Sequence, residues 1–145
     1  MFGLFRKATA AQSKADDRRR EEAAAKDHEE AEKALTVQKH CQLAIFKLRC
    51  AQDDEALPED LRDNASIQDA VNRFEGHKIE AIELARSITD QFYRDFALAC
   101  IVDACMAADQ RPQAREFLAV MKVDIARERV LKDHPTLAAP PLPGD

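Results

Sequence analysis

Apolar residues recur every three or four positions after residue 33, and this spacing is typical of helices that bury one face. The first stripe begins at Ala34, continues to Leu48 and predicts a helix that ends near Gln52. The same spacing predicts further helices over residues 66–74, 79–88, 91–108, 114–121 and 125–131. The segment 91–108 is apolar nearly all round, so we expect it to lie between neighbouring helices at the centre of the domain.

Capping and breaking residues set the expected limits of these helices. The acidic run at residues 53–55 is unfavourable at a helix C-terminus, and an acidic connection follows it. Asn64 or Ser66 is expected to cap the next helix, and Gly76 is expected to end it in the left-handed conformation. Asp90 is a good N-cap for the central helix.

The two ends of the chain differ in composition from its middle. Residues 1–33 are rich in alanine and in opposite charges three or four positions apart, which predicts an arm that is a solvated helix or partly disordered. A coiled coil is a weaker alternative for this arm. Residues 135–145 include three closely spaced prolines and predict a disordered tail. The α-helical domain is therefore expected to span residues 34–134.

Composition narrows the class of protein. The chain has no tryptophan and 3 glycines, and it is rich in strong helix formers, so we predict an all-α fold. No apolar run approaches the roughly 20 residues of a membrane span, and Arg6 and Lys7 interrupt any signal-peptide core, so a cytoplasmic location is expected. The net charge of -5 disfavours general binding to nucleic acids.

A weak internal echo links two segments of the domain. Residues 81–98 reappear at 114–131, shifted by 33 positions, and a period of this length is typical of stacked helical hairpins. The identical pairs are Ala81/Ala114, Glu83/Glu116, Arg94/Arg127 and Leu98/Leu131. The echo therefore favours a compact stack of antiparallel hairpins, with the charged N-terminal helix or arm extending from it.

The apolar pattern of this region resembles a tetratricopeptide-like helical repeat over about residues 66–131. The resemblance is carried by the run at residues 97–101 and by Ala114, Leu118 and Met121. In that family, small and large apolar residues on two antiparallel helices let successive hairpins stack. The resemblance implies a protein-interaction scaffold that binds a peptide or a helix in a groove.

The sequence carries no recognisable catalytic motif, so no enzyme activity, catalytic residue or cofactor is expected. Its four cysteines lack CxxC spacing and are interpreted as buried thiols. The histidines lie in different segments, and the neighbours His40 and Cys41 point about 100° apart on a helix, so no metal site is expected either.

Two groups of residues are candidates for binding a partner protein. The apolar side chains of Phe2, Leu4 and Phe5 beside two cations could enter a partner's groove or touch a membrane surface. The second group is the pair of charged dipeptides at equivalent places in the echo, which line a binding surface or brace neighbouring hairpins. These dipeptides are Arg94-Asp95 and Arg127-Glu128.

The predicted function is that of a non-enzymatic interaction module or adaptor. One alternative is a structural subunit that self-associates, or docks into a larger assembly, through its N-terminal helix. A less favoured alternative is a regulator of nucleic-acid transactions that acts through the arginine cluster at residues 18–20, although neighbouring carboxylates cancel much of that charge.

Overall fold

The computed structural model describes residues 2–140 and 143–144, with side chains described from Thr9 onward. The described part of the chain is helical and contains no strand, which confirms the predicted all-α class. Its elements are α1 (Phe2–Glu55), η1 (Glu59–Leu61), α2 (Asn64–Arg86), α3 (Gln91–Ala107), α4 (Arg111–Val120), α5 (Asp124–Asp133) and η2 (Pro135–Ala138), where η denotes a 3-10 helix.

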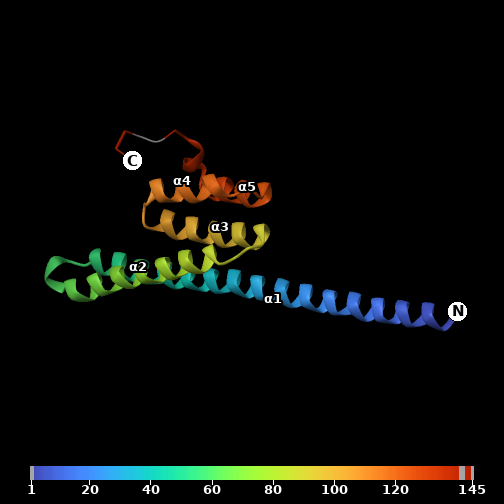
Figure 1. The fold of residues 1–145 in the computed structure, drawn as a ribbon. Helices are drawn as coiled ribbons and strands as arrows, with labels where there is room; N and C mark the ends of the chain where they lie inside the picture. Colours follow the sequence, from blue (N-terminus) through green and yellow to red (C-terminus); the bar gives the residue numbers. More distant parts are fainter. Residues whose placement is uncertain (1, 141–142, 145) are drawn as a thin grey trace.

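The helices run back and forth in successive layers above one long rod (Figure 1). The C-terminal half of α1 packs along α2, and α3 lies on both of them. Helices α4 and α5 cover the opposite side of α3. None of these helices, over the residues described, carries an apolar stretch long enough to cross a bilayer.

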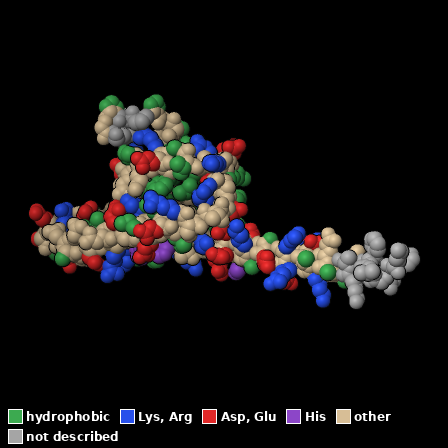
Figure 2. Space-filling model, in the orientation of Figure 1, with side chains coloured by type: hydrophobic (Ala, Val, Ile, Leu, Met, Phe, Trp, Pro, Cys, Tyr) green, Lys and Arg blue, Asp and Glu red, His purple; other side chains and the backbone are tan. Residues whose placement is uncertain are grey.

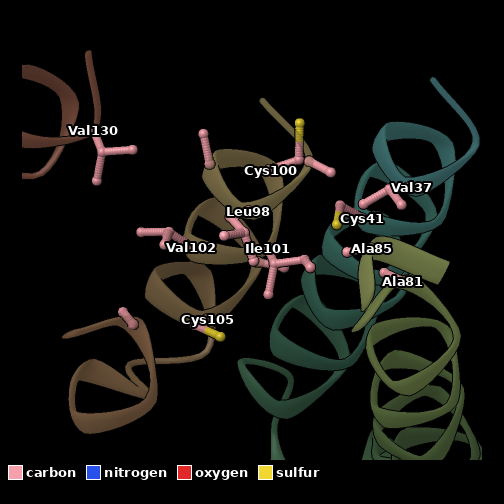
Figure 3. Close-up of a cluster of buried hydrophobic side chains, with 14 of the residues drawn as sticks. Val37, Cys41, Ala81, Ala85, Leu98, Cys100, Ile101, Val102, Cys105 and Val130 are labelled. Carbon is pink, nitrogen blue, oxygen red and sulfur yellow. The ribbon is translucent and has the colours of Figure 1, made fainter. Parts of the chain in front are cut away.

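Helix α3 is the centre of the hydrophobic core, as its all-round apolar sequence predicts. Every side chain from Ala97 to Cys105 is buried except that of Asp103. Figure 3 shows Ile101 of α3 directed toward the side of α1 and α2, and Val102 directed toward Val130 of α5. The central helix thus joins the two sides of the domain through opposite faces.

The N-terminal arm and the first core helix are one continuous helix. From residue 9 to residue 29 every side chain of α1 is exposed, and Glu30 is the first buried one. The apolar residues that follow, Ala34, Val37, Cys41 and Ala44, face the core. The change of composition near residue 33 therefore marks where α1 meets the domain, and the helix itself is uninterrupted there.

The expected helix stop at Gly76 is wrong. Helix α2 continues through this residue to Arg86, so the two helices predicted on either side of Gly76 are one. Burial of Phe74 and Ala81 holds both halves on α1, and this packing outweighs the roughly 1 kcal/mol that an internal glycine costs. The N-cap is Asp63, whose Oδ1 accepts hydrogen bonds from the backbone of the first turn.

Replacing Gly76 with alanine is expected to raise the free energy of unfolding by about 0.5–1 kcal/mol. The residue is exposed on a regular helix, and a Cβ placed there meets nothing within 4 Å. Urea unfolding followed by circular dichroism measures the change. A decrease in stability would show that the chain needs the conformational freedom of glycine at this point of α2.

Two buried carboxylates fix equivalent turns. Glu30 Oε2 accepts hydrogen bonds from the backbone N–H groups of Thr89 (2.6 Å) and Asp90 (2.9 Å), just before α3. Asp95 Oδ2 accepts bonds of 2.6 Å each from the N–H groups of Lys122 and Val123, just before α5. The two turns lie 33 positions apart, which is the period of the sequence echo.

Substitution of Glu30 with glutamine is expected to weaken the hold of α1 on the turn before α3, and to do so in a pH-dependent way. The hydrogen bond from the Asp90 N–H lowers the pKa of Glu30 below its ordinary value of 4.5, against the opposing effect of burial. A lowered pKa means that this carboxylate stabilises the fold above about pH 4.5 and stops doing so as the pH falls through the lowered value.

The measurement is the urea midpoint of wild type and Glu30→Gln between pH 7 and pH 3. We expect the variant to unfold at lower urea at pH 7 and the two curves to converge in acid. Glu29→Gln is the matched control, since the exposed Glu29 shares Lys33 with Glu30, whereas the backbone N–H groups of Thr89 and Asp90 donate to Glu30. A gap between wild type and Glu30→Gln that stays constant down to pH 3 would contradict this role.

The chain does not leave the domain at the end of α5. The 3-10 helix η2 packs against α4 and α5, and its Leu137 is buried in the core. His134 Nε2 lies 2.7 Å from Asp103 Oδ1 on α3 and ties the start of this segment to the centre. Ordered packing therefore continues four residues past the predicted domain limit at 134, and residues 141, 142 and 145 of the predicted tail lie outside the described chain.

Candidate functional site: a groove between α2, α3 and α4

A groove of about 560 Å³ lies between α2, α3 and α4. Its apolar surface comes from all three helices and its edge is mostly cationic. On this side of the molecule, Figure 2 shows hydrophobic side chains gathered between the layers, with Lys and Arg side chains beside them. The lining residues are Ile82, Ala85, Arg86, Arg94, Leu98, Glu116, Phe117, Val120 and Lys122.

The groove exists because small and large side chains alternate across the layers. Ala85 of α2 and Leu98 of α3 are buried at its base, and the short Ala85 side chain leaves space that a larger residue would fill. Phe117 of α4 is half-buried, and Val120, at the end of α4, is 58% exposed. The base is therefore core surface that the neighbouring helices do not fully cover.

The charge of the lining is opposite to that of the whole chain. Arg86, Arg94 and Lys122 contribute three cations and Glu116 a single carboxylate, whereas the full chain has a net charge of -5. Within the described residues, none of these three cations forms a salt bridge; the Arg94 guanidinium donates to Gln91 Oε1 instead. Cations on the edge of an apolar groove favour a ligand that carries both apolar and acidic groups.

The structure separates the charged dipeptides of the echo. Arg94 lines the groove, but Asp95 is fully buried and its oxygens accept hydrogen bonds from Gln91, Lys122 and Val123. The second pair is also divided: the Arg127 guanidinium donates to two carbonyls at the end of α4, and Glu128 is exposed. Of these four side chains, the groove takes only Arg94.

Two clusters were predicted in the N-terminal arm, and the structure describes the side chains of one of them, the arginine cluster, which does not line the groove. Phe2, Leu4 and Phe5 belong to the first turns of α1, and their side chains lie outside the described part of the structure. In the arginine cluster, Arg18 lies 3.3 Å from Glu22, and Arg19 lies 3.8 Å from Asp16. Acidic residues of the same exposed helix thus partly neutralise this cluster, as its sequence indicates.

Sequence reasoning missed most of the groove. Ile82, Leu98 and Phe117 match the helical core pattern, and that pattern does not tell a fully covered position from one at the base of a groove. Arg86 and Lys122 carried no signal, because they stand near the ends of helices whose spatial order the sequence does not state. The one available signal was the small side chain of Ala85, which the 33-residue shift of the echo aligns with the larger Leu118.

The cysteines have the properties of structural thiols. Cys41, Cys100 and Cys105 are buried and Cys50 is half-buried, and all four are free. Burial raises the pKa of the Cys100 and Cys105 thiols to about 11, and it raises the pKa of Cys41 further. These three thiols are protonated at neutral pH and are poor nucleophiles.

One further group of side chains in the described structure has a composition suited to a metal ion. His40 of α1 lies beside His77 and Glu80 of α2, although the sequence places the two histidines far apart.

Comparisons of the chain with protein-family models, with curated proteins and with solved structures find no match.

Proposed function

We propose that this protein is a non-enzymatic interaction module that binds a segment of another protein in the groove between α2, α3 and α4. The observation that carries the proposal is an apolar groove edged by three cations that form no salt bridge within the described chain. The expected ligand is a short helix or extended segment that combines large apolar side chains with Asp or Glu.

The layered arrangement of the helices supports this proposal. A groove formed between helices from successive layers is the kind of surface that a tetratricopeptide-like scaffold would use, and the echo pairs Ala81/Ala114 and Ile88/Met121 are buried in both copies. The groove has room for a few side chains, so the affinity would come from a small number of apolar anchors together with complementary charge.

The substitution Val120→Asp is expected to abolish partner binding without unfolding the protein. Val120 is 58% exposed in the groove, so the variant places a carboxylate where acidic partner groups are expected and disturbs little packing. Ile125→Asp is the matched control, because Ile125 is 70% exposed on α5 and does not line the groove. Proteins retained from the native source by wild type and by both variants are compared by quantitative mass spectrometry.

The proposal requires a partner that wild type and Ile125→Asp retain and that Val120→Asp loses. A double charge reversal at Arg94 and Lys122 should lose the same partner, and added salt should weaken binding by wild type because exposed charges are screened. Equal retention of every partner by Val120→Asp and Ile125→Asp would place the binding surface elsewhere.

A second candidate function is self-association or docking through α1, and an exposed stripe on that helix favours it. Leu35, Leu43 and Phe46 are each about half exposed and lie within an arc of about 80° on one face. Light scattering over a range of concentrations tests this function. A dimer that dissociates on Phe46→Asp but not on deletion of residues 1–29 would assign self-association to the stripe, whereas a concentration-independent monomer would exclude it.

A further inference from the structure

Two imidazoles and a carboxylate meet where α1 packs against α2. His40 belongs to α1, and His77 and Glu80 lie three residues apart on one face of α2. One nitrogen from each histidine and one oxygen from Glu80 all lie within 4.8 Å of one another. The fold thus brings His40 of one helix beside His77 of the next, although the two histidines are 37 residues apart along the chain.

One close contact in this cluster, between His40 and Glu80, is not a hydrogen bond. His40 Nδ1 is buried and lies 3.1 Å from Glu80 Oε2, but Nδ1 has no hydrogen-bond partner within the described chain because the geometry is unsuitable. A buried polar atom without a partner is costly. A cation bound between the nitrogen and the oxygen would satisfy both atoms at once.

The three side chains stand on rigid backbone. Each of them immediately precedes a buried residue: His40 precedes Cys41, His77 precedes Lys78, and Glu80 precedes Ala81. The packing of α1 on α2 therefore fixes the three Cα positions, and little more than side-chain rotation is needed to bring the ligand atoms together. Ligands on packed helices are held more precisely than ligands on loops.

We propose that His40, His77 and Glu80 bind a divalent transition-metal ion of the zinc class and join α1 to α2. Zinc binds His nitrogen and carboxylate oxygen at about 2.0–2.2 Å, so tetrahedral ligand atoms stand about 3.3 Å apart. The 3.1 Å between His40 Nδ1 and Glu80 Oε2 is close to this value. The ligand atom of His77, which lies within 4.8 Å of the other two, would have to move toward them. Two imidazoles select zinc, cobalt or nickel over magnesium and calcium, which prefer oxygen ligands.

The site would keep one open coordination position. Three protein ligands leave the fourth tetrahedral position to water, and Glu80, with its side chain 59% exposed, gives solvent access to the cluster. An ion held by both helices binds the folded state preferentially and therefore stabilises it. This inference concerns the face between α1 and α2, and it does not depend on the groove between α2, α3 and α4.

The test is titration of the full-length protein, freed of metal by a chelator, with zinc chloride in an isothermal calorimeter. We expect one ion per chain and a higher melting temperature with zinc than without it. His40→Gln, His77→Gln and Glu80→Gln should each weaken binding by at least roughly 10-fold, since even loss of an outer-shell partner often costs roughly 10- to 100-fold. Glu80→Gln is an exposed change that preserves folding, which circular dichroism verifies.

His28→Gln is the matched control, because His28 is an exposed imidazole that faces Glu32 on the same helix, away from the cluster. It should bind zinc as wild type does. Cobalt(II) provides a second readout: its spectrum should show nitrogen and oxygen ligation without a thiolate charge-transfer band. The proposal is overturned by an absence of binding at one equivalent, by equal weakening in His28→Gln, or by a thiolate band that assigns the ion to cysteine.

Discussion

Replacing Asp95 with alanine is expected to lower the free energy of unfolding by about 2–4 kcal/mol, since charge-assisted hydrogen bonds are lost and buried donors are left without acceptors. The fully buried carboxylate accepts bonds of 2.6 Å from the Lys122 and Val123 N–H groups and from the Gln91 side chain. It therefore joins α3 to the turn that starts α5. Urea unfolding monitored by circular dichroism measures the loss.

The echo supplies the control for this prediction. Glu128 is the counterpart of Asp95 at a shift of 33 positions, but it is exposed, so Glu128→Ala should change stability by no more than about 0.5 kcal/mol. Asp95→Asn keeps an oxygen acceptor and should fall between wild type and Asp95→Ala. Equal effects of Asp95→Ala and Glu128→Ala would show that the turn before α5 does not depend on this carboxylate.

Periodicity predicted those parts of the fold that depend on local burial. The all-round apolar run of α3 identified the central helix. The buried positions of α1 begin at Glu30, close to the change in composition near residue 33. Gly76 misled the prediction because a glycine ends a helix only where the backbone turns left-handed. Packing of α2 on α1 keeps it helical there, and the sequence alone does not weigh that packing against the local cost.

The candidate sites were harder to predict because they depend on how helices are placed in space. His40 and His77 are 37 residues apart and become neighbours only when α1 and α2 align antiparallel in one register. Arg94 was identified as a candidate and does line the groove. The other two cations come from elsewhere, Arg86 from the end of α2 and Lys122 from the turn between α4 and α5. Charge spacing along one helix carries no information about such neighbours.

The echo has a clearer meaning in the turns than in the charged dipeptides. Glu30 braces the turn at residues 89–90 from α1, and Asp95 braces the turn at residues 122–123 from α3, so each turn is fixed by a carboxylate on the preceding layer. Glu30 has a longer side chain than Asp95, and the two residues are not 33 positions apart in the sequence. A search for identical residues at a fixed shift therefore does not detect this correspondence.

Substitution of Lys78 with methionine is expected to lower the free energy of unfolding by about 1–3 kcal/mol, because it removes charge-assisted hydrogen bonds and keeps most of the apolar stem. The buried Lys78 Nζ donates to Gln110 Oε1 (2.6 Å) and Gln113 Oε1 (3.1 Å), and it lies 2.9 Å from Glu75 Oε2. It thereby connects α2 with the start of α4. Lys39→Met, at an exposed position on α1, is the matched control and should change stability by no more than about 0.5 kcal/mol.

The pH dependence of Lys78→Met separates the ion pair with Glu75 from the hydrogen bonds to the two glutamines. Burial acts to raise the pKa of Glu75, but the hydrogen bonds from Lys78 and Gln110 outweigh it and hold the pKa below the ordinary value of 4.5. A carboxyl with a lowered pKa stabilises the fold above about pH 4.5 and loses that contribution as the pH falls through the lowered value. The difference in urea midpoint between wild type and Lys78→Met should therefore narrow below about pH 4.5. A difference that stays constant into acid would mean that the ammonium group stabilises the fold through its hydrogen bonds to the amides of Gln110 and Gln113, which do not titrate, and not through Glu75.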